Sequence, residues 1–291
     1  LGYAAALAFT SVIAGAATAP FAAHHFNRLT SYGLLANLAA VPALGLWAAP
    51  ALLAAAAAAP FGLEGPPLRL AGAGVDWILT VARFFAGQSG AVRAVPAAPH
   101  AAFLLIALGG LQLCLWRGAA LRAVGAGALA IGFALWAFGA ERPKALAAPG
   151  AALAGVLGPE GRALDHARAA GYAARVWLRR DGDAATPSAA AARPLWRREG
   201  DWAAAPLGQG WTLHRLEGRR LGDAAARCGP RDVVLAPDIA RAPPLGPCLW
   251  FDGEELGGAG ALALTPQGAD PGLRTGAEAA GRRLWTRGGP Q

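Results

Sequence analysis

The sequence predicts a bundle of membrane-spanning α-helices followed by a small soluble domain of the α+β class. The first observation is the distribution of charge: only six basic and two acidic residues precede residue 141, whereas residues 141–291 contain 20 basic and 16 acidic residues. A soluble domain normally carries about a quarter charged residues, so the first part of the chain is not one. The second observation is that this part contains uncharged apolar runs of about 20 residues, the length that crosses a bilayer as a helix. We therefore expect a transmembrane domain over residues 1–140 and a soluble domain over residues 141–291.

Four membrane spans are predicted from the apolar runs, at about residues 1–23, 32–53, 101–116 and 124–140. Pro42 is expected to bend the second span, because proline removes a helical hydrogen bond and its ring clashes with the preceding turn. The chain has no methionine and opens inside an apolar run. We therefore expect residue 1 to lie within a longer protein, and the first run to be a span rather than a signal peptide.

Residues 66–89 combine apolar residues at helical spacing with three charged ones. This pattern predicts an amphipathic helix that lies at the membrane interface or packs against the bundle. Short positively charged loops face the cytoplasm. We therefore expect the turn with Arg117 and Arg122, and the connection His24–Arg28, on the cytoplasmic side. Residues 61–98 and the soluble domain would then face the opposite side of the membrane.

Apolar alternation and turn signals predict the elements of the soluble domain. The run Gly158-Pro159-Glu160-Gly161 is expected to turn a hairpin, and Glu217-Gly218 a second one between residues 211–216 and 219–221. Residues 181–210 are rich in Ala, Pro and Arg, and are expected to form a loop or a partly disordered insertion. The other expected elements are helices at 167–180 and 223–228 and strands at 232–236, 248–252 and 261–264.

The sequence contains no recognisable catalytic set. It has no glycine-rich phosphate loop, no Ser/His/Asp combination and no paired carboxylates in a plausible site. A zinc site needs three or four clustered ligands, and the five histidines show no His-x-His pair. We therefore expect a protein that is not an enzyme and that has no metal or cofactor. In an oxidising compartment Cys228 and Cys248 could form a disulfide, whereas Cys114 is expected to be a small packing residue.

The transmembrane domain contains the motifs Thr18-Ala19-Pro20, His25-Phe26, Tyr32-Gly33 and Ala36-Asn37-Leu38. Together they resemble the competence domain of the ComEC family. A span ends in Thr-Ala-Pro and is followed by His-Phe, Tyr-Gly and Ala-Asn-Leu elements, with order and spacing kept over about 60 residues. The exit from the last span and the Gly-Pro-Glu-Gly-Arg hairpin are similar to those of alphaproteobacterial members. The residues that carry the resemblance are Ala17–Phe21, His25-Phe26, Ser31–Leu38, Val41-Pro42, Val75–Leu79, Arg142-Pro143 and Gly158–Arg162.

The resemblance implies a multi-pass protein of the bacterial inner membrane that forms part of a channel for single-stranded DNA uptake in natural transformation. Its partners would be single-stranded DNA, the lipid bilayer, a cytoplasmic DNA-translocating motor and a periplasmic DNA receptor, with the oligomeric state open. The soluble domain would be a shortened, periplasmic relative of metallo-β-lactamase-like domains. The strand Asp232–Ala236 is similar to the one that leads into a His-His-Gly element in the family, but Pro237-Asp238-Ile239 follows here. The alternatives are a membrane-anchored periplasmic nucleic-acid hydrolase and a non-catalytic membrane assembly protein.

Polar residues of the transmembrane domain are the candidates for a DNA path, and each has a structural alternative. His24, His25 and Arg28 could meet phosphates at the cytoplasmic mouth of a pore, or could simply anchor the topology. Asn37 could line the pore or bond a neighbouring helix. Three further candidates could face a water-filled path or form a solvated polar face: Arg69, Asp76 and Arg83.

Arginines and tryptophans of the soluble domain could form a DNA-facing patch, or could be solvated cations above core tryptophans. The residues concerned are Arg179, Arg180, Arg197, Arg198, Arg219, Arg220, Trp177, Trp196 and Trp211.

Overall fold

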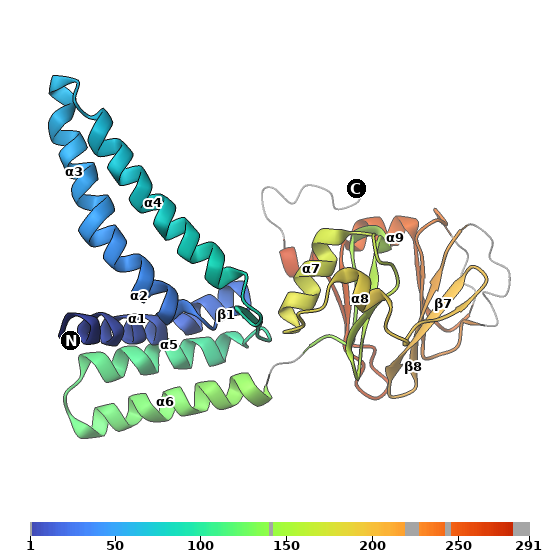
Figure 1. Cartoon of the computed structure of the whole chain (residues 1–291). Helices are drawn as coiled ribbons and strands as arrows, with labels where there is room; N and C mark the ends of the chain where they lie inside the picture. Colours follow the sequence, from blue (N-terminus) through green and yellow to red (C-terminus); the bar gives the residue numbers. More distant parts are fainter. Residues whose placement is uncertain (1, 140–141, 219–226, 242–245, 282–291) are drawn as a thin grey trace. The chain divides into compact units, whose positions relative to one another are not determined.

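The computed structural model describes residues 2–139, 142–218, 227–241 and 246–281. The chain divides into two compact units, Leu1–Ala140 (unit 1) and Glu141–Gln291 (unit 2). Unit 1 is helical and unit 2 is built on β-sheets, so the predicted order of a helical membrane part and an α+β part is confirmed (Figure 1).

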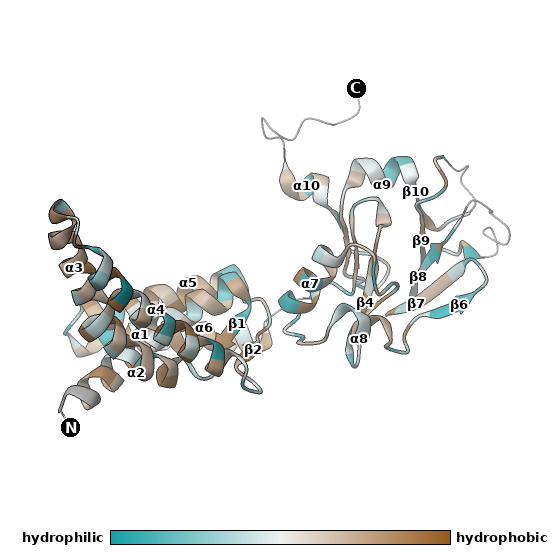
Figure 2. Ribbon diagram, turned by 45° about the horizontal axis from the view of Figure 1, so that its top comes forward, coloured by the Kyte–Doolittle hydropathy of each residue, from teal (hydrophilic) through white to brown (hydrophobic). Residues whose placement is uncertain are grey.

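Unit 1 is formed by apolar helices (Figure 2). Three of its helices are long and apolar enough to cross a membrane: Ala5–Phe26, Gly33–Phe61 and Ala119–Phe138. A fourth apolar helix, His100–Leu115, is shorter. The elements in chain order are α1 (Gly2–Phe26), β1 (Arg28–Thr30), α2 (Gly33–Ala43), a π-helical turn η1 (Leu44–Ala48), α3 (Ala49–Ala58), η2 (Ala59–Phe61), α4 (Gly65–Ala86), β2 (Val92–Ala94), α5 (His100–Leu115) and α6 (Ala119–Phe138).

The second helical run is interrupted by a wider turn. The Ala49 N–H donates to the Leu44 carbonyl five residues back, which is the π-helical pattern. Pro50 follows directly, and its ring would clash with a carbonyl four residues earlier in a regular helix, so the wider turn relieves that clash. The run extends to Phe61 rather than ending near residue 53, because the alanines beyond Leu53 are strong helix formers.

Helix α4 packs antiparallel on α2 and α3. The Trp77 indole donates to the Ala39 carbonyl at 3.1 Å. Gly74 lies against Ala48, where an added Cβ would come within 3.1 Å of the Ala48 Cβ. The glycine therefore favours this close crossing, because a side chain there would press on Ala48, and α4 packs along the second helix.

The strands β1 and β2 form a short antiparallel ribbon that joins distant parts of unit 1. Arg28 pairs with Ala94, and the Val95 N–H donates to the Asn27 carbonyl at 3.1 Å. Helix α6 returns to the same end, where the Trp136 indole donates to the Pro96 carbonyl at 3.0 Å. We call this the ribbon end of unit 1.

The ribbon corrects the predicted orientation. Residues 92–98 lie beside the His24–Arg28 connection, so the prediction that these segments face opposite sides of the membrane is wrong. The physical reason is that α4 packs along the second helix and runs back to the ribbon end, whereas the sequence analysis expected a helix at the membrane interface. The turn Trp116–Gly118 between α5 and α6 lies at the opposite end, and Arg122 belongs to the first turn of α6 rather than to the connection.

Helices α5 and α6 pack backbone against backbone. A Cβ on Gly109 would lie 2.8 Å from the Gly125 carbonyl oxygen, and one on Gly125 would lie 2.9 Å from the Gly109 carbonyl oxygen. A Cβ on Gly132 would lie 3.0 Å from the Ala102 carbonyl oxygen. Small residues of this kind let membrane helices approach closely, so these three glycines determine how the pair fits together.

Unit 2 contains two five-stranded sheets with the orders β10-β9-β8-β7-β6 and β12-β11-β3-β4-β5. Residues from both sheets, among them Val156, Leu213 and Val233, form one buried cluster, so the sheets pack face to face. The elements are β3 (Ala145–Ala147), η3 (Pro149–Ala151), β4 (Ala154–Gly158), β5 (Gly161–Leu164), α7 (Gly171–Arg180), α8 (Pro187–Ala191), β6 (Arg197–Glu199), β7 (Trp202–Gly208), β8 (Trp211–Leu216), β9 (Asp232–Ala236), β10 (Leu249–Asp252), α9 (Gly253–Ala259), β11 (Leu262–Leu264), β12 (Leu273–Thr275) and α10 (Gly276–Ala280).

The hairpin around residues 158–161 is present as β4 and β5. The partner of β8 differs from the prediction: β8 pairs with β7 before it and with β9 after it. Residues 219–221 and most of the helix expected at 223–228 lie outside the described residues. The expectation of a loop over 181–210 is wrong, because β7 alternates buried residues such as Ala203 and Ala205 into the core.

Candidate functional site

The ribbon end gathers aromatic and cationic side chains. His24 and His25 end α1, and His100 begins α5. The His24 ring stacks on Phe103 with centroids 4.3 Å apart, and lies 5.2 Å from the His25 ring and 5.3 Å from the His100 ring. Three imidazoles therefore share one end of the helices.

Arg28 and Arg93 lie on the ribbon beside this histidine cluster. Arg28 is exposed in β1, and Arg93 is exposed in β2 opposite Leu29. Asn27 takes the left-handed conformation, with φ 53°, that turns the chain from α1 into the ribbon. Ser31 and Tyr32 hold the following loop by donating to the Gly90 and Ser89 carbonyls at 2.7 Å and 3.2 Å. The ribbon end thus presents positive charge on a fixed turn.

The charged residues of α4 form a stripe on one face of that helix. Arg69, Asp76 and Arg83 are spaced by seven residues, so they lie on one line about 21 Å long. All three are exposed. The packed face of α4 lies on the other side of the helix and contains Ala71, Gly74 and Val81. We call Arg69, Asp76 and Arg83 the α4 stripe; it points away from α2 and α3.

Apolar residues border the α4 stripe on both sides. Leu68 and Leu79 lie on one flank, and Leu70, Trp77 and Phe84 lie on the other, all of them exposed. Charged side chains that face lipid are costly, and in membrane helices they face water or a polar partner. The stripe between apolar flanks is therefore a narrow polar seam in an otherwise lipid-compatible surface.

Asn37 is exposed on α2, and its side chain forms no hydrogen bond within the described part of the chain. The bond to a neighbouring helix that the sequence offered as an alternative is therefore not present among the described residues. The structure does not gather all seven candidates: His24, His25 and Arg28 share the ribbon end, while the α4 stripe runs along the helix.

His100, Phe103 and Arg93 were not singled out from the sequence, although they complete the ribbon end. The sequence did contain a signal for this cluster: His100 is the first residue of α5, and His24 and His25 lie in the last turn of α1. That signal becomes useful only once the two helix ends are known to meet.

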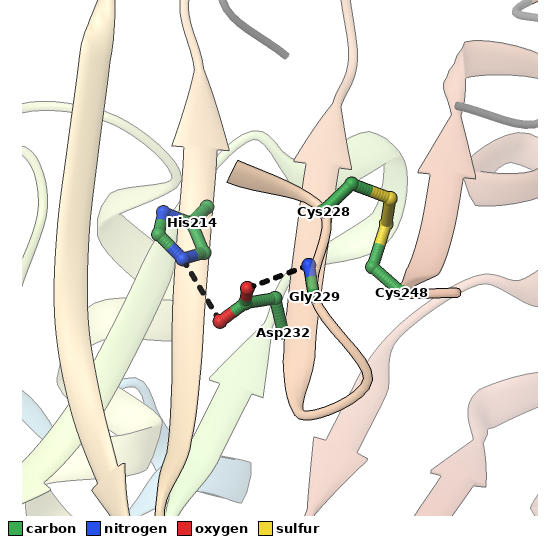
Figure 3. Close-up of a disulfide and its surroundings, with 5 residues drawn as sticks. All are labelled: His214, Cys228, Gly229, Asp232 and Cys248. Atoms are coloured by element: carbon green, nitrogen blue, oxygen red, sulfur yellow. Dashed lines mark hydrogen bonds and ion pairs between the residues drawn. A yellow bond between two sulfur atoms is a disulfide. The ribbon is translucent and has the colours of Figure 1, made fainter. Parts of the chain in front are cut away.

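Unit 2 contains a disulfide between Cys228 and Cys248, whose Cα atoms are 4.7 Å apart (Figure 3). It joins the segment before β9 to the start of β10, which pairs with β9 in parallel. Beside it, the Gly229 N–H donates to Asp232 at 2.9 Å, and the other Asp232 oxygen lies 3.2 Å from His214 Nε2. The disulfide and the Asp232 carboxylate therefore hold the entrance of β9.

Buried ion pairs anchor the other sheet of unit 2. Arg162 is fully buried and contacts both Asp181 oxygens, at 2.6 Å and 3.2 Å. It also donates to the Pro143 and Gly155 carbonyls at 3.0 Å and 3.1 Å. Its charge is therefore fully partnered, and the bond to Pro143 ties the first residues of unit 2 to its sheet.

Asp183 forms a second pair, with Arg193 at 2.6 Å. Burial opposes ionisation of Asp183, but the hydrogen bonds from Arg193 and from the Ala185 N–H, together with the Arg193 charge, outweigh it and lower the pKa of Asp183. Since these carboxylates are all engaged by arginines, they are structural groups.

Metal ligands are not clustered in the described ranges: no three His, Cys, Asp or Glu side chains there could hold a metal ion together. The tryptophans proposed for a DNA-facing patch are structural, since Trp211 lies in the core with 3 % of its surface exposed. The Trp196 indole donates to the Ala163 carbonyl at 3.1 Å, and Trp177 packs against a buried cluster.

Comparison with known proteins gives a result for unit 1 alone. No curated protein and no solved structure matches the chain, so the likeness of unit 2 to metallo-β-lactamase-like domains stays a prediction. Residues 2–120, which include α1 to α5 and both ribbon strands, match the family model described as Competence protein, so this segment of unit 1 is similar to that family.

Proposed function

We propose that unit 1 forms part of the path by which single-stranded DNA crosses the inner membrane during natural transformation. The match to the Competence protein model links this unit to DNA uptake. The observation that carries the path itself is the α4 stripe, a row of charged side chains on the exposed face of a helix in the matched segment. An anionic strand needs such a polar seam, because its phosphates cannot enter lipid.

The orientation that we propose places the ribbon end and unit 2 in the periplasm, and the turn with Arg117 in the cytoplasm. The preference for positive charge on the cytoplasmic side does not decide this orientation, because Arg28 and Arg93 lie at the ribbon end and Arg117 lies at the other. The Cys228–Cys248 disulfide supports the same orientation, because disulfides persist in oxidising compartments such as the periplasm. The histidine cluster, Arg28 and Arg93 would therefore lie at the periplasmic mouth of the path.

The mechanism that follows is passive guidance. Cations at the ribbon end would attract the strand, and Arg83 and Arg69 would contact phosphates further along α4. Asp76 lies between them and keeps the seam from binding the strand too strongly, since conduction requires contacts weak enough to release. The sequence holds no nucleotide-binding motif, so energy would come from a cytoplasmic motor, with a periplasmic receptor delivering the DNA.

A transformation assay that separates periplasmic from cytoplasmic DNA tests the proposal. The full-length gene is deleted in the source bacterium and then complemented with wild type, Arg69→Gln/Arg83→Gln or Asp76→Asn. We expect deletion and the double variant to abolish cytoplasmic arrival while periplasmic uptake continues. Glu64→Gln, which also converts an acid to an amide but lies beside the N-terminus of α4, is the matched control for Asp76→Asn and should transform normally. If deletion leaves the transformation frequency unchanged in a strain shown to be transformable, the proposal is refuted.

A second measurement separates a water-filled path from an interfacial helix. Single cysteines are placed at Asp76 and at the flanking Leu79, in a Cys114→Ser background, and labelled with a water-soluble maleimide. A path predicts labelling at position 76 alone, and protection of that site by single-stranded DNA. Labelling that single-stranded DNA does not change would favour a solvated polar face.

A further inference from the structure

We infer that helix α7 of unit 2 carries a second contact site for single-stranded DNA, formed by Tyr172, Arg175 and Arg179. The inference rests on the proposed function for the identity of the polyanion. It extends that function to unit 2, which would bind the strand without catalysing a reaction on it. We call these three residues the α7 stripe.

The α7 stripe follows from helical geometry. Ala174 and Leu178 are buried with 1 % and 2 % of their surfaces exposed, and they attach α7 to the rest of unit 2. Residues 172, 175 and 179 fall on the opposite side at a spacing of 3.6 residues per turn. Tyr172 has 77 % of its surface exposed, Arg175 is exposed and Arg179 is half-buried. One face therefore offers an aromatic ring and two guanidinium groups within about 11 Å along the axis.

The guanidinium groups of this face are not neutralised. Within the described ranges neither Arg175 nor Arg179 forms an ion pair or a side-chain hydrogen bond, and the same holds for the exposed Arg180 next to them. The nearest acids in sequence are already engaged: Asp181 is bonded to Arg162, and Asp183 to Arg193. A solvated surface normally mixes both signs of charge, so this cluster leaves positive charge available to an anion.

The chemistry of the stripe fits a single-stranded nucleic acid. Such strands bind where cations contact phosphates beside aromatic rings on which bases stack. The main competing polyanion is a surface of acidic lipids. Helices that bind lipid surfaces insert an apolar face into the headgroup region, and the apolar face of α7 is buried in the core of unit 2. Figure 2 shows that α7 contains hydrophilic residues.

The test uses the full chain in phosphatidylcholine nanodiscs and a fluorescein-labelled oligothymidine, with binding followed by anisotropy across a salt series. Arg175→Gln/Arg179→Gln keeps helix-forming residues and removes two positive charges. Each phosphate contact to a single strand contributes about 0.7 to the slope of log K against log salt. We expect the double variant to lower the slope by about 1.4, which corresponds to roughly 25-fold weaker binding at about 0.1 M salt. Tyr172→Ala should weaken binding about five-fold or more through lost stacking.

The matched control is Arg241→Gln/Arg274→Gln, which removes two exposed arginines elsewhere in unit 2. It should leave the slope within error of wild type. If wild type binds oligothymidine, and the α7 variant and this control have the same affinity and salt slope, then the α7 stripe is not the contact site. The proposed function would still stand in that case. If wild type does not bind the oligothymidine at all, both fail.

A lipid-binding role is tested in the same preparation by hydrogen exchange of the α7 amides. The inference expects oligothymidine to protect them in phosphatidylcholine nanodiscs. Protection by added anionic phosphatidylglycerol, without protection by oligothymidine, would overturn it in favour of lipid headgroups.

Discussion

Removal of the Asp181 carboxylate is expected to lower the stability of unit 2 strongly. Arg162 is fully buried, and Asp181 is its only acidic partner among the described residues. Asp181→Asn keeps the volume of the side chain but leaves a buried guanidinium without a counter-charge. Breaking such a pair from one side costs about 3–5 kcal/mol. The bonds from Arg162 to the Pro143 and Gly155 carbonyls remain and do not supply negative charge.

That cost is a large fraction of the stability of an ordinary domain, which is about 5–15 kcal/mol. For a unit of this size it corresponds to a fall of about 6–20 °C in the melting temperature of unit 2. The assay is hydrogen exchange of the full chain in detergent, resolved to the peptides that cover β4 and β5. We expect the protection of their core amides to fall by two orders of magnitude or more, since each 1.4 kcal/mol is about ten-fold.

The control is Glu217→Gln, which breaks the exposed pair of Glu217 with Arg198 at 3.0 Å. Exposed pairs contribute about 0–1 kcal/mol, so protection should change by less than about five-fold. Equal effects of the two substitutions would refute the reasoning, because they would mean that water reaches Arg162 and replaces its counter-charge.

Three further outcomes follow from the contacts described. Gly109→Leu should separate α5 from α6 and lower the amount of folded protein in detergent, measured by size exclusion, because a Cβ there meets the Gly125 carbonyl oxygen at 2.8 Å. Cys248→Ser should destabilise unit 2 by about 3 kcal/mol in chemical denaturation, the entropy of a closed loop of about 20 residues, since its bond to Cys228 is lost. The pKa of Asp183 is lowered in the folded state. Its contribution to stability is therefore complete above its unfolded pKa of about 3.9 and is lost as the pH falls below that value. Asp183→Asn should thus lower the melting temperature at neutral pH and have less effect in acid.

Each of these has a matched comparison. Gly110→Leu changes a neighbouring glycine that has open space around it and should leave the fold intact. Cys114→Ser removes the free cysteine and should not alter denaturation of unit 2. Dithiothreitol should reproduce the effect of Cys248→Ser; stability that is indifferent to both would contradict the role of the disulfide. A difference between Asp183→Asn and wild type that grows as the pH falls would contradict the sign of the pKa argument.

The sequence by itself determined the helical and sheet-rich parts and most of the individual helices and strands. These features depend on local composition and on periods of two or 3.6 residues, which any short window contains. The strand β9 and the hairpin β4–β5 were therefore readable, as was an amphipathic helix with a charged face at α4. The strand β7 was missed because its alternating residues are mostly alanine, whose burial depends on what packs above it.

Only the tertiary structure decided which ends of the helices meet. The pairing of Arg28 with Ala94 spans more than sixty residues, and no local pattern encodes it. That pairing makes α4 a returning helix, brings His100 to His24, and places the Arg117 turn at the end opposite Arg28. An amphipathic pattern of this length does not tell which neighbour its apolar face contacts. In the folded chain that neighbour is the second helix, through the contact of Gly74 with Ala48.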